Sequence, residues 1–217
     1  MRVLPAASPP RDLRASRNRN FSSALLLAAL AVFACGCKHI EPIDIKPLDA
    51  AGMNYDSIKQ LQLLHITAPE VAEVAKARNG GLTDRDCIEI VQIYHGGGRQ
   101  FDAGDTVAGL VQVRMHDDTI LQLARMNQLG LGAGELQAIR LVGLSDAVVL
   151  EVARRHSEGK TVLSGASLGA LKNTGLRETT LLELVRRGVP DSQVSEIVAL
   201  RRHRATDADI LRRFGGA

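Results

Sequence analysis

The sequence predicts an all-α protein made of tandem helix pairs, and three observations favour this fold. Apolar residues recur at spacings of three and four through residues 66–214, the period of a helix that buries one face. Glycine followed by Leu or Val recurs along the same stretch and indicates helix ends. The strand pattern of alternating apolar and polar residues is sustained nowhere in the sequence, so we expect little or no sheet.

The clearest joint between two helices lies at residues 143–146. Gly143 suits the left-handed position after a helix end, Leu144 closes back onto that helix, and Ser145 with Asp146 caps the next one. With Leu144 as position zero, the same pattern predicts ten helices. Their zero positions are Ile66, Leu82, Asp102, Met115, Leu131, Leu144, Leu163, Leu176, Val189 and Ala205.

The fifth and eighth positions of this register predict the buried face of each helix. All ten fifth positions are apolar, and the eighth position is polar only at Arg213. The fifth positions are Val71, Cys87, Val107, Ile120, Leu136, Val149, Leu168, Leu181, Val194 and Ile210. The apolar eighth positions are Val74, Ile90, Leu110, Leu123, Ile139, Val152, Leu171, Leu184 and Ile197.

The sixth position separates two kinds of helix. It is apolar in the helices that start at 82, 115, 144, 176 and 205, and small or polar in those between them. The starts of the first kind lie 33, 29, 32 and 29 residues apart, so the helices pair with a period of about 31 residues. This period fits a solenoid, but the uneven spacing also fits a compact helical bundle. We expect left-handed helix ends at Gly81, Gly130, Gly143, Gly175 and Gly188.

The N-terminus has the pattern of an export signal. Five arginines precede a 14-residue apolar run without a charge at residues 21–34, and Cys35, Gly36 and Cys37 follow it. The run is short for a membrane span. A cleaved signal is therefore the main interpretation, and an uncleaved anchor that extends to Cys37 is an alternative.

The residues after this run resemble the lipobox of bacterial lipoproteins, in which a cysteine preceded by small residues is acylated and becomes the mature N-terminus. The resemblance implies lipid attachment at Cys37, because Gly36 precedes it and polar residues follow at once; Cys35 is the alternative. Neither cysteine has the Leu that the family prefers three residues before it. The resemblance implies an exported protein held in the bacterial cell envelope by its N-terminal lipid and facing the periplasm. Whether the inner or the outer membrane holds it stays open.

Three segments follow from these patterns. Residues 1–36 are the expected signal peptide of the lipoprotein type, residues 37–55 an extended tether, and residues 56–217 the helical repeat domain. Pro42, Pro47 and Gly52 favour the extended tether. In the helical domain, Cys87 occupies a fifth position, so we expect a buried thiol rather than a reactive one.

The charge balance of the exported protein argues against nucleic acid as a partner. The whole chain has 27 Lys and Arg against 24 Asp and Glu, but the leader up to Ala34 holds five Arg and one Asp, which leaves 22 against 23. The chain also has no Trp, two Tyr and four Phe, so few side chains are suited to stack on bases. Because no cluster of His, Cys, Asp and Glu has metal-ligand spacing, we expect no metal and no cofactor.

The helix joints show a second resemblance. Phe101-Asp102 and the joint at residues 143–146 are similar to joints in uncharacterised helix-pair repeats of predicted secreted bacterial lipoproteins. The similarity covers most of residues 66–214, and the joint at residues 113–117 departs from it by lacking the glycine. No activity follows from this resemblance.

Two short strings suggest a different function, that of a serine hydrolase. Residues 95–98 read His-Gly-Gly-Gly, and residues 165–169 read Gly-Ala-Ser-Leu-Gly, which resemble the oxyanion loop and nucleophile elbow of esterases and lipases. Ser167 with Asp191 and His203 would form the triad. However, the stretch that follows Gly169 is short, and it reads as helices. The register places Ser167 on an exposed helix face and His95 at a solvated helix end, so the hydrolase is the alternative and we expect no enzyme.

Arginines at the ends of successive helices suggest an interaction surface. Arg125, Arg154 and Arg186 stand ten residues after the starts at 115, 144 and 176, and Arg155 and Arg187 lie beside two of them. Cations stabilise the last turn of a helix, and a column of guanidinium groups also suits an acidic protein or anionic envelope component. We therefore expect a non-enzymatic interaction scaffold that docks an envelope partner on these arginines. A purely structural envelope anchor is the further alternative.

Overall fold

The computed structural model of the protein describes residues 43–131 and 133–214. The predicted signal peptide, with Cys35 and Cys37, lies outside these residues. The described part consists of twelve α-helices and one short 3₁₀ helix, and it contains no strand. The prediction of an all-α protein is confirmed.

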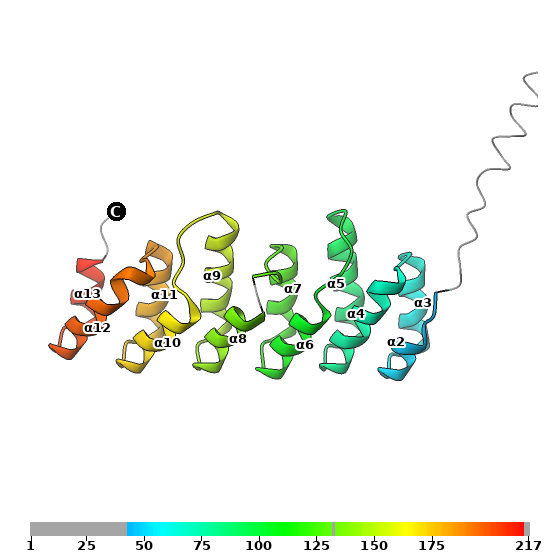
Figure 1. The fold of residues 1–217 in the computed structure, drawn as a ribbon, viewed down its shortest axis with the longest axis horizontal. Helices are drawn as coiled ribbons and strands as arrows, with labels where there is room; N and C mark the ends of the chain where they lie inside the picture. Colours follow the sequence, from blue (N-terminus) through cyan, green and yellow to red (C-terminus); the bar gives the residue numbers. More distant parts are fainter. Residues whose placement is uncertain (1–42, 132, 215–217) are drawn as a thin grey trace, which may run out of the picture. The chain divides into compact units, whose positions relative to one another are not determined.

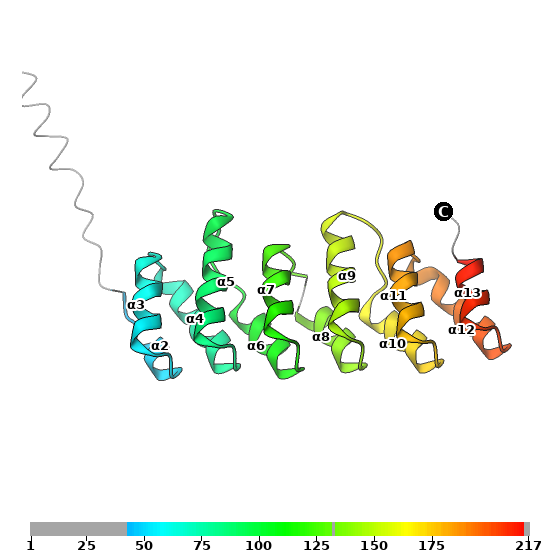
Figure 2. The same cartoon turned by 180° about the vertical axis from the view of Figure 1, so that it is seen from behind.

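The helices lie in two rows, shown from opposite sides in Figures 1 and 2. Each helix packs against the helices two places before and after it in the chain, as repeat-like folds do. The even row holds α2 (Lys46–Ala50), α4 (Ala68–Asn79), α6 (Gly104–Gln112), α8 (Ala133–Leu141), α10 (Gly165–Asn173) and α12 (Val194–Arg202), with η1 (Asp191–Gln193) directly before α12. The odd row holds α3 (Tyr55–Leu63), α5 (Asp84–Gly96), α7 (Asp117–Arg125), α9 (Asp146–Ser157), α11 (Glu178–Arg187) and α13 (Asp207–Arg213).

The ten predicted helices are α4 to α13, and the predicted buried columns form their core. All nine apolar eighth positions are buried. Nine of the ten fifth positions are buried as well, and Val194 is half-buried. Cys87 is one of these buried residues, and burial raises the pKa of its thiol to about 12, so it is protonated and unreactive at neutral pH.

Part of the predicted N-terminal tether is helical. Residues 46–50 form α2, with Pro47 in its first turn, where a missing amide hydrogen costs nothing. Leu48 and Met53 are buried against the rest of the core. Within the described residues, the interpretation of residues 46–55 as an extended tether is therefore wrong, because apolar side chains there complete the first helix pair.

The joint at Gly143 has the predicted geometry. Gly143 has a φ of 76°, in the left-handed region, and its amide donates to the carbonyl of Arg140. The Leu144 amide donates to the carbonyl of Ile139, and the Leu144 side chain is buried. Gly81, Gly175 and Gly188 also have positive φ, but Gly130 does not. Asn127 takes the left-handed conformation in that joint, so the prediction for Gly130 is wrong.

Small residues bring the even-row helices close together. A Cβ at Gly104 would overlap the backbone of Glu73 on α4, and one at Gly165 would lie 2.9 Å from the Cβ of Ala138 on α8. Ala108 holds the sixth position of α6, and a Cβ at Gly80 would overlap the Cα of Ala108, so a glycine is required there. The small sixth positions that the sequence assigned to these helices therefore lie where neighbouring even-row helices approach each other.

Candidate functional site

The three arginines of the predicted column lie on the odd row. Arg125, Arg154 and Arg186 belong to the last turns of α7, α9 and α11, and their side chains are 53%, 46% and 54% exposed. Because α7, α9 and α11 are neighbours in one row and the three arginines share one register position, we expect their guanidinium groups on one face of the protein.

Each of these arginines has a glutamate beside it. Arg125 pairs with Glu89 on α5, and Arg154 pairs with Glu151 and Glu158 on either side of it along the chain. In the third case, Nη1 of Arg186 lies 4.0 Å from a carboxylate oxygen of Glu183. The face is therefore a ladder of surface ion pairs. Such exposed pairs are weak and exchange partners readily, so an incoming carboxylate competes with the glutamates for the same guanidinium groups.

The other two predicted arginines are used inside the protein. Arg155 is 9% exposed; its Nη1 donates to the carbonyl of Arg186 at 2.6 Å, and its Nε donates to the carbonyl of Thr161 at 3.2 Å. Arg187 donates to the carboxylate of Glu183 and to a backbone carbonyl of α13. Arg155 therefore fastens α9 to the end of α11, and Arg187 fastens α11 to α13.

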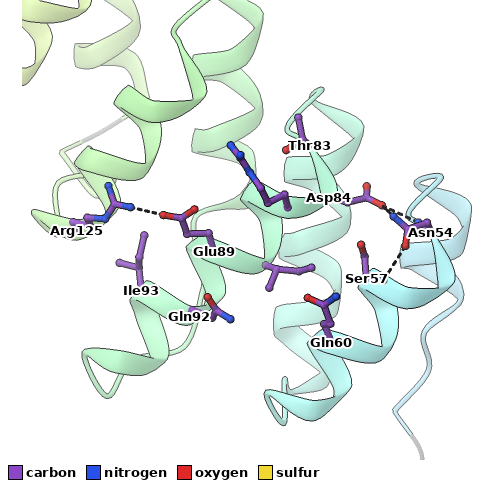
Figure 3. A pocket seen from close by; sticks show the side chains of 11 residues that line it. Asn54, Ser57, Gln60, Thr83, Asp84, Glu89, Gln92, Ile93 and Arg125 are labelled. Atoms are coloured by element: carbon purple, nitrogen blue, oxygen red, sulfur yellow. Dashed lines mark hydrogen bonds and ion pairs between the residues drawn. The ribbon is translucent and has the colours of Figure 1, made fainter.

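A groove opens next to Arg125, between α3 and α5 on the odd row (Figure 3). Its volume is about 830 Å³. Gln60 comes from α3, Gln92 and Ile93 from α5, and the Arg125–Glu89 pair closes one end. The groove lining is mainly polar or charged, with Ile88 and Ile93 as its apolar side chains, and such side chains can hydrogen-bond to a bound peptide segment.

The other end of the groove is held by an ion-paired aspartate. Asp84 accepts hydrogen bonds from the backbone amide of Asn54, at 2.9 Å, and from its side-chain amide, and it pairs with Nε of Arg78 at 2.5 Å. The carboxylate thereby joins the start of α3, the end of α4 and the start of α5. The groove walls are fixed relative to one another before any partner arrives.

The same arrangement recurs twice along the odd row, and we call it the aspartate clasp: Asp84, Asp146 and Asp207, each with an arginine six positions before it. Asp146 accepts from the amide of His116 and the hydroxyl of Thr119, and Asp207 accepts from Arg177 and Thr180 in the same way. Burial alone would raise the pKa of Asp146, but these hydrogen bonds and the charge of Arg140 outweigh burial and lower it.

The predicted hydrolase residues occupy helix termini. Ser167 is in the first turn of α10, where its amide donates to the hydroxyl of the capping residue Ser164. Asp191 accepts from the amide of Ser164, and hydrogen bonds from both serines lower the pKa of Asp191 against the effect of burial. His203 lies at the far end of α12, and nine helical residues, about 14 Å, separate the two ends of that helix. The structure brings Ser167 and Asp191 together and leaves His203 apart from them.

Glycines of the two hydrolase-like strings have packing roles. Gly165 permits the close contact with α8 described above, and Gly98 takes a left-handed conformation after α5. His95 is not the solvated helix end that the sequence suggested. Its Nε2 lies 2.7 Å from Oε1 of Glu70, a carboxylate that is 1% exposed and also accepts from the amides of Phe101 and Thr67. His95 helps to satisfy this buried charge.

Sequence reasoning missed the groove and the Glu70–His95 pair. Glu70 and His95 are 25 residues apart, and no local pattern connects them.

Among the described residues, no group of three or more His, Cys, Asp and Glu side chains is placed to hold a metal ion. In the same part of the chain, none of the helices combines the length and the apolar character needed to cross a membrane. No protein-family model matches the chain, and neither does any curated protein.

Proposed function

We propose that the protein is a lipid-anchored component of the bacterial cell envelope whose helical domain docks a partner without catalysing a reaction. The observations that carry the proposal are three half-exposed arginines on the odd row and a groove of about 830 Å³ between α3 and α5, which Arg125 lines. Two-row helical stacks leave such long faces open, and their partners bind along them. A helix-pair repeat of about 31 residues accounts for the regular placement of the arginines.

Anchoring rests on the sequence of the leader. Acylation at Cys37, or at Cys35 as the alternative, holds the protein at a membrane, since each buried CH₂ contributes about 0.8 kcal/mol of membrane affinity. Metabolic labelling with a radioactive or clickable fatty acid tests this assignment. Label should disappear in Cys37→Ser and persist in Cys35→Ser. The reverse result would move the site to Cys35, and labelling that survives both changes would refute the lipoprotein assignment.

Docking rests on the charges of the odd row. A partner with several carboxylates would displace Glu89, Glu151 and Glu183 from their arginines. Half-exposed ion pairs allow this exchange, whereas buried pairs would not. Because Arg155 and Arg187 donate to backbone carbonyls within the protein, the proposed docking arginines are Arg125, Arg154 and Arg186. The partner is an acidic envelope protein, and no nucleic acid, metal or cofactor takes part.

The test is crosslinking in cells with a photoreactive residue at Gln92, an exposed residue of the groove. A partner should be captured there and not from Ala170, an exposed residue of the even row. The double change Arg154→Glu with Arg186→Glu should remove the captured protein, while Arg202→Glu on the even row makes the same kind of charge change and should leave capture intact. Equal loss in both variants, or no loss with a folded protein, would contradict docking on this face and favour the purely structural anchor.

A further inference from the structure

A second cavity lies where α5 ends and α6 begins, beside the connection between α7 and α8; Figure 1 shows these elements next to one another. Its volume is about 580 Å³, within the range of sites that hold small molecules. The apolar part of its wall comes from Leu129, Ala103 and the ring of Tyr94. We call it the α5–α6 pocket. None of the arginines of the proposed docking face lines it.

Tyr94 presents a hydroxyl to this pocket. The side chain is 4% exposed, and its ring meets that of Phe101 edge to face, with 5.3 Å between the ring centres. Its hydroxyl makes no hydrogen bond with the described residues and is not among their buried unpaired polar atoms, so it is accessible to solvent or to a ligand. Burial raises the pKa of Tyr94, so the hydroxyl is protonated and available as a donor.

Arg99 supplies a positive charge at the same place. Its guanidinium carbon lies 4.5 Å from the centre of the Tyr94 ring, a cation–π arrangement that fixes its plane. One of its nitrogens donates to the side-chain oxygen of Asn127. A guanidinium group has five N–H donors, and within the described residues this is the one hydrogen bond that the Arg99 guanidinium makes. Most of its donors therefore have no protein partner.

Asp102 supplies a negative charge that Arg99 does not neutralise. The side chain of Asp102 lines the pocket and is exposed, and its charge acts on the Tyr94 hydroxyl. Among the described residues, Asp102 has neither an ion pair nor a hydrogen bond to its side chain. An arginine and an aspartate thus face one small cavity without pairing. This arrangement suits a ligand that carries both charges on neighbouring atoms.

We propose that the α5–α6 pocket binds a free α-amino acid. The ligand's carboxylate accepts from Arg99 and from the Tyr94 hydroxyl, and its ammonium group pairs with Asp102. Its side chain lies against Leu129 and Ala103. The polar groups of the pocket select the zwitterion, because a ligand with one charge would leave the opposite charge of the pocket without a partner. This inference does not depend on the proposed docking function.

The protein carries its own probe for the test. It has no Trp and two Tyr, and the second, Tyr55, is 65% exposed on α3. In full-length protein with Tyr55→Phe, purified in detergent, all tyrosine fluorescence comes from Tyr94. Titration with L-alanine should change that fluorescence along a saturable curve. Acetate and methylammonium, which each carry one of the two charges, should bind at least tenfold more weakly.

Two substitutions assign the contacts. In the Tyr55→Phe background, Arg99→Gln and Asp102→Asn should each weaken L-alanine binding at least tenfold, while Arg212→Gln on the distant α13 should leave it unchanged. Circular dichroism and the melting temperature check that each variant is folded, and Asp102→Asn, at an exposed position, carries the test if Arg99→Gln does not fold. Absence of saturable binding, equal affinity for acetate and L-alanine, or unchanged binding in folded Asp102→Asn would overturn the proposal.

Discussion

The even row and the odd row are built from the same register but join their helices differently. In the even row, small side chains such as Ala108 and Gly169 stand at the sixth position, and helix backbones nearly touch. In the odd row, larger apolar residues hold that position, and Ile88 and Leu121 are buried there. Polar contacts differ as well, since the odd row carries the aspartate clasps and the ladder of surface ion pairs. The even row therefore relies on small residues at its helix contacts, and the odd row uses larger apolar residues there.

The largest expected effect comes from breaking the close packing of the even row. Gly104→Ala places a methyl group against the backbone of Glu73, and neither side has a flexible atom that moves aside. We expect unfolding in urea to show a loss of about 3 kcal/mol, the upper range for overpacking. Gly134→Ala is the matched control in the same row, because a Cβ there meets nothing within 4 Å. Equal effects of the two changes would show that the close approach at Gly104 does not limit which residue that position accepts.

The next effect concerns the polar joints of the odd row. Asp146→Asn keeps the shape of the side chain but removes its negative charge. In the wild type this charge pairs with Arg140 and strengthens the hydrogen bonds from His116 and Thr119. We expect a loss of about 2 kcal/mol in the free energy of unfolding. Asp105→Asn, at an 80% exposed ion pair on the even row, should change stability very little. Similar losses in both variants would show that the clasp is no stronger than a surface pair.

Acid should destabilise the protein through buried carboxylates of both rows. Hydrogen bonds from Phe101, Thr67 and His95 outweigh burial and lower the pKa of Glu70 below its usual 4.5. A carboxyl group whose folded pKa is lowered stabilises the protein above its unfolded pKa and loses that contribution as pH falls through the folded value. The melting temperature should therefore fall as pH drops below about 4.5, less steeply in Glu70→Gln than in wild type. Identical pH profiles would show that Glu70 does not contribute.

The smallest expected effect is none at all, and it concerns Ser167 in the even row. Its place in the first turn of α10, with His203 at the far end of α12, leaves its hydroxyl without the histidine base of a triad. Wild type should not react with a fluorophosphonate probe. Stoichiometric labelling that vanishes in Ser167→Ala would instead support the serine hydrolase and assign a catalytic role to the packing row.

The sequence predicted most of this fold because its signals are local. Helix period and caps lie within one or two turns, so all ten predicted helices were found, and even the difference between the rows was visible at the sixth position. The sequence missed α2 because prolines and alternating charges masked a helix that buries Leu48. It also treated Arg154 and Arg155 alike. Adjacent residues point about 100° apart on a helix, so one faces solvent while the other reaches the end of α11.

The site was less predictable, because its parts come from different helix pairs. The groove beside Arg125 needs Gln60 from α3 and Gln92 from α5, two helices that α4 separates along the chain, and no single stretch of sequence shows a cavity between them. Pairs such as Glu70 with His95 depend in the same way on which helices become neighbours. A local pattern identifies the arginines but not their partners, so the charge state of a surface is known only after the rows are assembled.

The aspartate clasps determine how this stack can be lengthened or shortened. Their aspartates, Asp84, Asp146 and Asp207, are the first residues of α5, α9 and α13. The clasps therefore fall at every second joint between neighbouring helices of the odd row. The joints between them have their own link in the even row, where Glu73 accepts from the amide of Gly104 and Glu135 from that of Gly165. A chain engineered by adding or removing one helix pair would therefore place unlike joint surfaces against each other. Adding or removing four helices at a time, such as α6 to α9, should instead bring like joint surfaces together.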